Sequence, residues 1–261
     1  MMIFIGERIN TGFKSIKNAV LNKDGDVIRE CARKQANGKA DYLDVNLGAA
    51  SNNPEDLCWM IEMVQEEVDL PICIDNNKPQ MLKETIPVCK RPPLVNSVIA
   101  DEKKLDEILP IVKQYGASLI GLAMDESGSP ATADKRVENA GLIVAKFMEY
   151  DIPTDKLFLD PIVMPLKFMQ NQAVEILQAS SQFGLFADPP CHIVCGLSNI
   201  SNGAIHKGLI NRIFATMLVA NGLDAVIMNV NDEDLVDAIL TAELIMNKSI
   251  YADSYLEAFK R

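Results

Sequence analysis

The sequence predicts a (β/α)8 TIM barrel built from the whole chain, residues 1–261, as a single domain. Eight short apolar runs alternate with longer amphipathic segments along the sequence. The length of 261 residues is close to the roughly 250 that this fold typically uses. No Ser/Pro-rich linker, charged block or low-complexity tract divides the chain. The competing fold is a doubly wound open sheet, but the GxGxxG fingerprint expected after its first strand is missing.

The eight apolar runs are brief and are bounded by polar residues or glycine. Strands of a parallel sheet have this pattern because both of their faces are buried. In chain order the predicted strands are Met2–Ile5, Tyr42–Val45, Ile72–Ile74, Leu94–Val95, Ser118–Leu122, Leu157–Leu159, Ile193–Cys195 and Ala225–Met228.

The segment after the second run shows how the intervening helices are recognised. Asn53 and Pro54 begin a helix, and Glu55 and Asp56 place negative charge in its first turn, where the helix dipole favours it. The apolar residues that follow fall on one helical face. They are Leu57, Met60, Ile61, Val64 and Val68.

Two further helices are predicted from the same signals. One has its apolar face over 105–115 and ends at Gly116, and Pro110 is expected to bend it because proline has no N–H group. The last helix begins with the polar residues 231–234 and continues to Ile245.

Composition and charge exclude several classes of protein. Hydrophobic residues make up 48% of the chain, more than a disordered protein contains. The net charge of −11 argues against a nucleic-acid partner, because phosphates are bound by clustered Lys and Arg. No run reaches the roughly 18–20 apolar residues of a membrane span. Glu7 and Arg8 interrupt the apolar start where a signal peptide would continue. We therefore expect a cytoplasmic protein without a membrane partner.

The cysteines and histidines give no clear metal site. Cys191, His192 and Cys195 resemble half a metal site, but the segment CHIVCG alternates like a buried strand, and this interpretation is favoured. His206 is the only other histidine, so we expect no bound metal and no Ser-His-Asp triad. The six cysteines contain no CxxC pair and predict no disulfide framework. They are Cys31, Cys58, Cys73, Cys89, Cys191 and Cys195.

Polar residues follow or end most of the predicted strands, where a barrel of this type has its active site. Asp and Asn also favour strand ends because they form turns and cap helices. Turn formation alone is the weaker explanation for carboxylates at three strand ends together with several amides. The polar residues are Glu7, Arg8, Asn10, Asp44, Asn46, Asp75, Asn76, Asn77, Asn96, Ser97, Asp160, Asn229, and Ser198 and Asn199 of the segment Gly196-Leu197-Ser198-Asn199.

This set of side chains suits a flat, hydrogen-bonding heterocycle. A carboxylate accepts two parallel hydrogen bonds from a ring N–H and an adjacent amine, and amides both donate and accept. A pterin ring presents such a mixture of groups. The sequence offers no nucleophile with an adjacent base. We therefore predict a site that binds and polarises its ligand while a cofactor carries the difficult step.

Six segments, each at the end of a different predicted strand, resemble a known family. It is the family of methyltetrahydrofolate:corrinoid protein methyltransferases, in the pterin-binding barrel superfamily with dihydropteroate synthase and the folate domain of cobalamin-dependent methionine synthase. The resemblance also includes LINRIF (209–214) and YADSY (251–255), so that it covers essentially the whole chain. The six segments are IGERIN (5–10), DYLDVNLG (41–48), ICIDNN (72–77), LVNS (94–97), FLDP (158–161) and GLSNIS (196–201).

The resemblance implies roles for individual residues. Asp75, Asn96 and Asp160 match the positions that bind the pterin ring. Asn199 matches the catalytic amide that contacts N5, the nitrogen that carries the methyl group. Gly196 and Ser198 belong to the same loop, which brings the backbone close to the ligand.

Four more residues have less definite roles in this resemblance. Asp44 and Asn46 match a DxNxG pattern, and they either line the floor of the pocket or hold Asp75 and Asn96 in place. Asn202 and Lys207 stand in a loop where the family usually carries Gln and Arg. Their match to the N5 network and to the folate tail is loose.

The family's reaction implies the substrate and the partner. Methyltetrahydrofolate or tetrahydrofolate is the substrate, and N5 must become positively charged to leave as an amine. Asn199 would accept a hydrogen bond from the protonated N5, an interaction that strengthens as charge develops. The chain lacks the DxHxxG element of corrinoid-binding domains, so a separate corrinoid protein must supply the cobalamin-type cofactor transiently. A homodimer is expected from the family. The residues leave the direction of methyl transfer open.

Two other functions remain possible from the sequence. Dihydropteroate synthase must bind a pyrophosphate leaving group, which calls for an anion-binding first loop and a basic residue after the last strand. Here the first loop reads GERINTGFKS and the last reads MNVNDED. A pterin-binding protein without activity is the second alternative.

Overall fold

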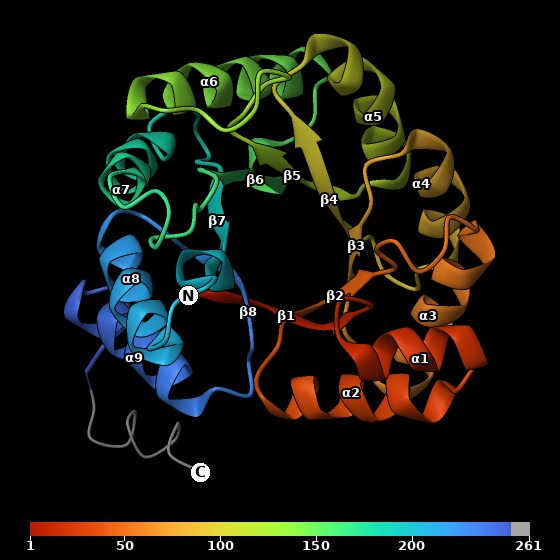
Figure 1. Ribbon diagram of the computed structural model, residues 1–261. Coiled ribbons are helices and arrows are strands. Elements are labelled where there is room, and N and C mark those ends of the chain that lie inside the picture. The colour runs from red at the N-terminus through yellow and green to blue at the C-terminus, as the bar shows by residue number, and fades with distance from the viewer. Residues whose placement is uncertain (252–261) are drawn as a thin grey trace.

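Eight parallel strands close into a barrel in the computed structural model, which describes residues 1–251 (Figure 1). Each strand pairs with its neighbours in chain order, and β8 pairs with β1. The strands are β1 (Ile3–Asn10), β2 (Tyr42–Asn46), β3 (Ile72–Asp75), β4 (Leu94–Ile99), β5 (Ser118–Leu122), β6 (Leu157–Asp160), β7 (His192–Gly196) and β8 (Ala225–Met228). The predicted fold is therefore confirmed.

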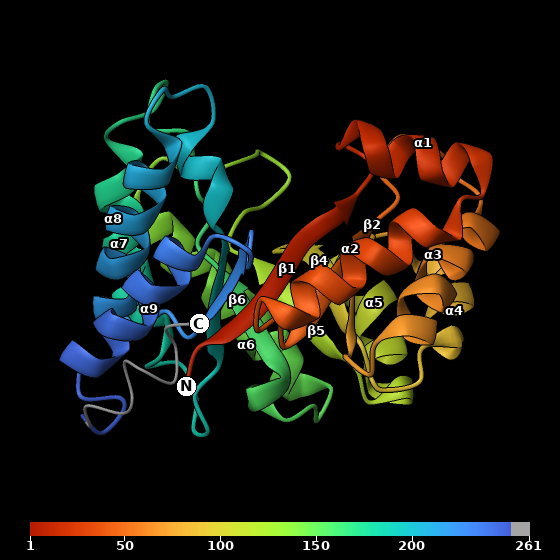
Figure 2. The same cartoon turned by 90° about the horizontal axis from the view of Figure 1, so that it is seen from below.

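The helices form a ring outside the barrel (Figure 2). Two of them, α1 and α2, come between β1 and β2 in the chain. The α-helices are α1 (Lys14–Asn22), α2 (Gly25–Asn37), α3 (Pro54–Glu67), α4 (Pro79–Thr85), α5 (Glu102–Tyr115), α6 (Ala133–Glu149), α7 (Gln172–Phe183), α8 (Lys207–Ala220) and α9 (Glu233–Ile245). Short 3-10 helices are η1 (Ile86–Val88), η2 (Thr154–Lys156) and η3 (Leu197–Ser201).

The helix boundaries follow the local signals in the sequence. The side chain of Asn53 caps α3 by accepting a hydrogen bond from the N–H of Glu55. Gly116 ends α5 in the left-handed conformation, with φ 60°, where glycine meets little steric resistance. Pro110 lies inside α5, which continues to Tyr115. Asp232 caps α9 at the position predicted.

An apolar layer fills the inside of the barrel, separate from the larger core between strands and helices. Leu122 and Ile227 pack against this layer and also line the cavity at the C-terminal end of the barrel. Because the layer occupies the interior, polar side chains further along the strands lie at the C-terminal end of the barrel. The buried members of the layer are Ile5, Cys73, Leu94, Ile120, Phe158, Val194 and Ala225.

Two strands continue several residues beyond the apolar runs that predicted them. β1 continues to Asn10, so Glu7, Arg8 and Asn10 lie within the strand and not after it. β4 continues to Ile99 and contains Asn96 and Ser97. Both extensions are stabilised by pairing with a neighbouring strand, which continues past the apolar residues. The prediction of their ends was wrong because polar residues facing a cavity interrupt the apolar pattern.

Two further observations concern the described residues. Among residues 1–251, no helix is long and apolar enough to cross a membrane. Residues 252–255 of the segment YADSY lie outside the described part of the chain.

Candidate functional site

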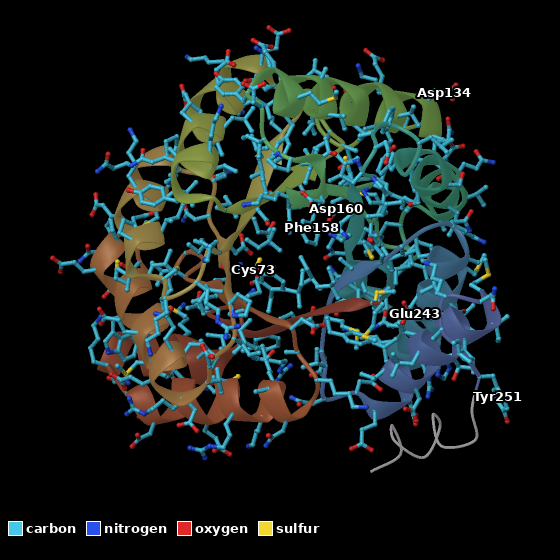
Figure 3. All side chains as sticks on the ribbon, turned by 180° about the vertical axis from the view of Figure 1, so that it is seen from behind. Cys73, Asp134, Phe158, Asp160, Glu243 and Tyr251 are labelled. Atoms are coloured by element: carbon cyan, nitrogen blue, oxygen red, sulfur yellow. The ribbon has the colours of Figure 1, made fainter. Side chains whose placement is uncertain are left out.

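A cavity of about 350 Å³ opens at the C-terminal end of the barrel. Asp160 and Phe158 from β6 and Cys73 from β3 lie inside the ring of helices (Figure 3). The cavity joins polar groups from β1, β2, β3, β4, β6 and the segment after β7. Its lining consists of Glu7, Asn10, Asp44, Asp75, Asn96, Ser97, Leu122, Asp160, Ile162, Val163, Gly196, Ser198, Asn199 and Ile227.

Asp44 and Asp75 each accept hydrogen bonds from neighbouring side chains. Asp44 Oδ2 accepts hydrogen bonds from the Asn96 amide and the Cys73 thiol, each over 3.2 Å. The Asn46 amide donates to Asp75 Oδ2. These contacts hold the side chains in fixed orientations from three adjacent strands.

The electrostatics of this pair favour retention of a proton. Burial, followed by the nearby charge of Asp75, raises the pKa of Asp44. Burial also raises the pKa of Asp75, against the hydrogen bond from Asn46 that lowers it. Two carboxyl groups in one poorly solvated site cannot both ionise easily, so the pair holds a proton to a higher pH than isolated carboxyls do.

Asp160 occupies the opposite side of the barrel at the end of β6. Its Oδ1 accepts a hydrogen bond of 2.7 Å from the backbone N–H of Ile162. Burial raises the pKa of Asp160 to about 6, although backbone N–H groups of Ile162 and Gly196 lower it in part. The side chain therefore remains a strong hydrogen-bond acceptor whose charge is poorly solvated by its surroundings.

Glu7 belongs to the site although the sequence analysis gave it no role beyond its place near a strand end. The Ser198 hydroxyl donates to Glu7 Oε1 over 2.8 Å, and this contact joins β1 to the loop after β7. Burial raises the pKa of Glu7. Alternation along β1 could have identified it, because Glu7 is two residues after Ile5, which faces the barrel interior.

Asn199 lies on η3 at the mouth of the cavity and is exposed. A Cβ atom at Gly196 would stand 3.1 Å from the amide nitrogen of Asn199. Glycine at 196 therefore leaves room for this amide beside the end of β7. An exposed amide fixed on a short helix can both donate and accept hydrogen bonds to a ligand.

The structure brings together most, but not all, of the predicted site residues. All six predicted pterin-binding residues line the cavity, and so does Asp44. Asn46 does not line the cavity but contacts Asp75. Asn202 and Lys207 are exposed and lie outside the lining. The six are Asp75, Asn96, Asp160, Gly196, Ser198 and Asn199.

The Cys191-His192-Cys195 segment forms part of the framework of the barrel. His192 Nδ1 lies 2.7 Å from Asp224 Oδ2, and its ring stacks on Phe158 with centroids 4.4 Å apart. Cys191 and Cys195 are buried. Within residues 1–251, no three His, Cys, Asp or Glu side chains are grouped as metal ligands would be.

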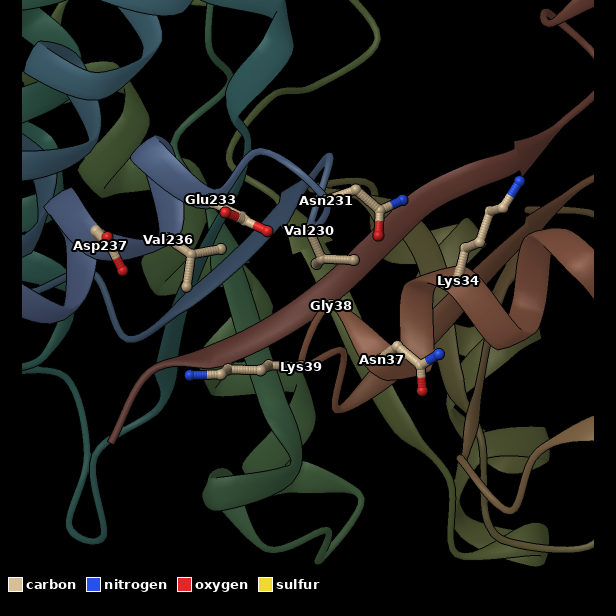
Figure 4. A pocket seen from close by; sticks show the side chains of 9 residues that line it. All are labelled: Lys34, Asn37, Gly38, Lys39, Val230, Asn231, Glu233, Val236 and Asp237. Atoms are coloured by element: carbon tan, nitrogen blue, oxygen red, sulfur yellow. The ribbon is translucent and has the colours of Figure 1, made fainter. Parts of the chain in front are cut away.

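Two of the other hollows lie outside the barrel. One of about 210 Å³ lies between α2 and α9, with Lys34 and Lys39 on one side and Glu233 and Asp237 on the other (Figure 4). A second, of about 560 Å³, is lined by Arg8 and by acidic residues of α2 and the turn before it. Both are lined by side chains of both signs. The inner cavity, by contrast, holds buried carboxyl groups, so we place the candidate site there.

The fold and the cavity define a class of protein. It is a barrel whose C-terminal end carries acidic and amide groups suited to a flat, polar heterocycle. Residues 6–229 match the family of pterin binding enzymes. The chain therefore belongs to that family, and the resemblance identified from the sequence is confirmed at this level.

Individual relatives agree with this assignment. The chain is 34% identical to the methylcorrinoid:tetrahydrofolate methyltransferase of Eubacterium limosum, over 100% of this chain and 97% of that protein. It is 23% identical to the methionine synthase of Mycobacterium tuberculosis, over 87% of this chain but only 20% of that longer protein. A dihydropteroate synthase from Coxiella burnetii in complex with pteroic acid has the same fold, with a TM-score of 0.70 and 16% sequence identity. The match covers 95% of this chain and 94% of that chain.

Proposed function

We propose that this protein moves a methyl group between N5 of methyltetrahydrofolate and the cobalt of a corrinoid carried on a separate protein. The observation that carries the proposal is the full-length match to the Eubacterium limosum methyltransferase. That relative's name has the methyl group passing from a methylcorrinoid to tetrahydrofolate, and we infer the same direction here.

The cavity supplies the chemistry that folate binding requires. Asp75 and Asp160 accept hydrogen bonds from the ring N–H groups and the exocyclic amine of the pterin, and Asn96 meets a mixed edge with its amide. Leu122 and Ile227 form an apolar floor below these groups. A flat ring bound in this way is held in one plane, so that N5 takes a fixed position relative to the mouth of the cavity.

Asn199 acts at N5. Forming or breaking the bond between N5 and the methyl carbon places positive charge on nitrogen in the transition state. The side-chain oxygen of Asn199 accepts a hydrogen bond from the protonated N5, and this interaction is stronger in the transition state than with the neutral amines of methyltetrahydrofolate and tetrahydrofolate. The same argument holds for both directions of transfer, because they share one transition state.

The corrinoid, when bound, supplies a cobalt centre that exchanges the methyl group. Its carrier protein approaches the C-terminal rim, because the cavity opens there. Docking is transient, since the partner must leave to exchange its methyl group elsewhere.

The protein also acts as a homodimer in this proposal. Leu209, Ile213 and Met217 are exposed at successive turns of α8, although they are large and apolar. An apolar stripe on one helix is covered when a second copy packs its own α8 against it. Sedimentation at several protein concentrations tests this, and replacement of Ile213 by Glu should give monomers.

The function is tested with Asn199→Ala and the matched variant Asn202→Ala, an exposed neighbour that does not line the cavity. Methyl transfer is followed by the absorbance of the cobalt corrinoid after mixing with the folate substrate, and folate binding is measured by calorimetry. We expect Asn199→Ala to lower the rate of transfer by about 10²–10³-fold and to weaken binding far less. Asn202→Ala should behave as the unaltered protein.

Three outcomes would contradict the proposal. Equal losses of rate and binding would make Asn199 a binding residue only. Folate binding without any change of the corrinoid spectrum would favour a non-catalytic pterin-binding protein, and condensation of a dihydropterin pyrophosphate with p-aminobenzoate would favour a dihydropteroate synthase.

A further inference from the structure

Arg136 is a buried cation beside the site, on α6 and outside the cavity lining. No part of its surface is exposed to solvent. Its guanidinium donates to Pro161 O over 2.7 Å, to Gln172 Oε1 over 2.8 Å and to Thr132 O over 3.3 Å. All three acceptors are neutral carbonyl oxygens. Burial of a charge whose hydrogen-bond acceptors are all neutral is unfavourable, and burial lowers the pKa of Arg136, against the nearby charges of Glu175 and Asp160, which raise it. An arginine in this position therefore requires an explanation.

The backbone that Arg136 contacts is itself in an unfavourable conformation. Ile162 has φ 64°, in the left-handed region that β-branched residues rarely adopt. Ile162 also lines the cavity. Such a conformation persists only where the surrounding contacts enforce it.

One peptide group connects Arg136 to Asp160. The carbonyl of Pro161 accepts the hydrogen bond from Arg136 Nε, and the N–H of Ile162, in the same peptide plane, donates to Asp160 Oδ1 over 2.7 Å. This plane is thus held at both ends. A bond at one end also polarises the amide and strengthens the bond at the other.

We propose that Arg136 is a positioning residue of the cavity: through the peptide between Pro161 and Ile162 it fixes the orientation of the Asp160 carboxylate and favours its charged form. The proposal rests on the proposed function only in taking a pterin as the ligand. Lysine could not replace it fully, because an ammonium group lacks the planar fork that reaches three carbonyls from separate segments.

The hydrogen bond from Arg136 to Gln172 also helps to hold this part of the cavity wall. Gln172, the first residue of α7, accepts from Arg136 and donates to Ala131 O over 3.0 Å. The start of α7 and the segment before α6 are therefore joined behind the Asp160–Ile162 turn. The positive charge of Arg136 also opposes the effect of burial on the pKa of Asp160.

The test uses Arg136→Met and Arg136→Lys in the full-length protein. Thr154→Ala, which removes a hydrogen bond to Pro189 O near the N-terminal end of the barrel, is the control for a general loss of stability. The ionisation of Asp160 is followed by carboxyl carbon NMR without ligand and is assigned with Asp160→Asn. Affinity for tetrahydrofolate is measured by calorimetry between pH 5 and 8.

We expect Arg136→Met to move the Asp160 titration to higher pH and to weaken tetrahydrofolate binding about tenfold at pH 7, the effect of losing one hydrogen bond. In Arg136→Lys the Asp160 titration should stay close to that of the unaltered protein, but part of the affinity for tetrahydrofolate should be lost. Thr154→Ala should change neither. An unchanged Asp160 titration and unchanged affinity in folded Arg136→Met would overturn the proposal.

Two further outcomes remain decisive. If Arg136→Met does not fold, Arg136→Lys decides, and affinity equal to that of the unaltered protein would contradict a role for the three-carbonyl contact. If the unaltered protein does not bind tetrahydrofolate, the proposed function fails, but the ligand-free titration of Asp160 still tests the role of Arg136.

Discussion

At the N-terminal end of the barrel, polar side chains are paired within the protein, whereas at the C-terminal end carboxyl groups face a cavity. His192 contacts Asp224, whose other oxygen accepts from the N–H of Ile193 over 2.7 Å. Thr154 donates to a backbone carbonyl. By contrast, Asp44 and Asp160 lie in the cavity with raised pKa values.

The difference separates stability from binding. Paired groups at the N-terminal end make their hydrogen bonds as soon as the chain folds, and so they stabilise it. The cavity carboxyls lose solvation on folding, and the protein does not fully replace it. The N–H groups of a ligand can form hydrogen bonds with these carboxyls in place of the lost water. The free energy of these hydrogen bonds then contributes to binding. Substitutions at the two ends of the barrel test this division.

Asp75→Asn and Asp160→Asn should each weaken tetrahydrofolate binding by about 10–100-fold, the range for one hydrogen bond to a charged group. An amide keeps the size of the side chain, but it can offer only one acceptor and presents a donor to the ligand's own N–H groups. Calorimetric titration at pH 7 measures the effect. Affinity within twofold of the unaltered protein would show that the carboxylates do not contact the ligand.

The ionisation of Asp160 should lower the free energy of unfolding of the ligand-free protein as the pH rises from 4 to 7. Its pKa is about 6 in the folded chain and close to its usual 3.8 when unfolded. The folded state therefore binds the proton more tightly over this range, and the stabilisation present below pH 4 is lost as the pH passes 6. The difference corresponds to about 3 kcal/mol.

Urea unfolding of Asp160→Asn alongside the unaltered protein measures this contribution. The variant should be more stable at pH 7 and should lack this part of the pH dependence. An identical pH dependence in both proteins would mean that Asp160 ionises normally.

Asp224→Asn should reduce the free energy of unfolding by about 1 kcal/mol, because it weakens the contact with His192 at a partly exposed position. Tetrahydrofolate affinity should not change. Chemical denaturation and calorimetry together give the result, and a loss of affinity would show that the two ends of the barrel are coupled.

Lys207→Ala should change tetrahydrofolate affinity by less than about twofold, since an exposed charge outside the cavity contributes little. A larger loss, which increases at low salt, would instead assign Lys207 to the anionic folate tail.

Much of this architecture was predictable because buried strands require apolar residues. Each of the eight runs became a strand, and most of the polar residues near their ends line one cavity. Glu7 was placed near a strand end but was given no individual role, because it interrupts an apolar run and the strand continues through it. Arg136 could not be found in this way. It lies on a helix, and its partners Pro161 and Gln172 are 25 and 36 residues away in sequence.

Ile162 has a consequence for how this protein tolerates mutation. Glycine adopts a φ of 64° easily, so Ile162→Gly would relax the backbone, but it would also remove a side chain from the cavity wall. Stability and ligand recognition therefore favour different residues at one position. In a library randomised at position 162, selection for thermal stability should enrich glycine. Selection for tetrahydrofolate binding should instead retain bulky apolar residues.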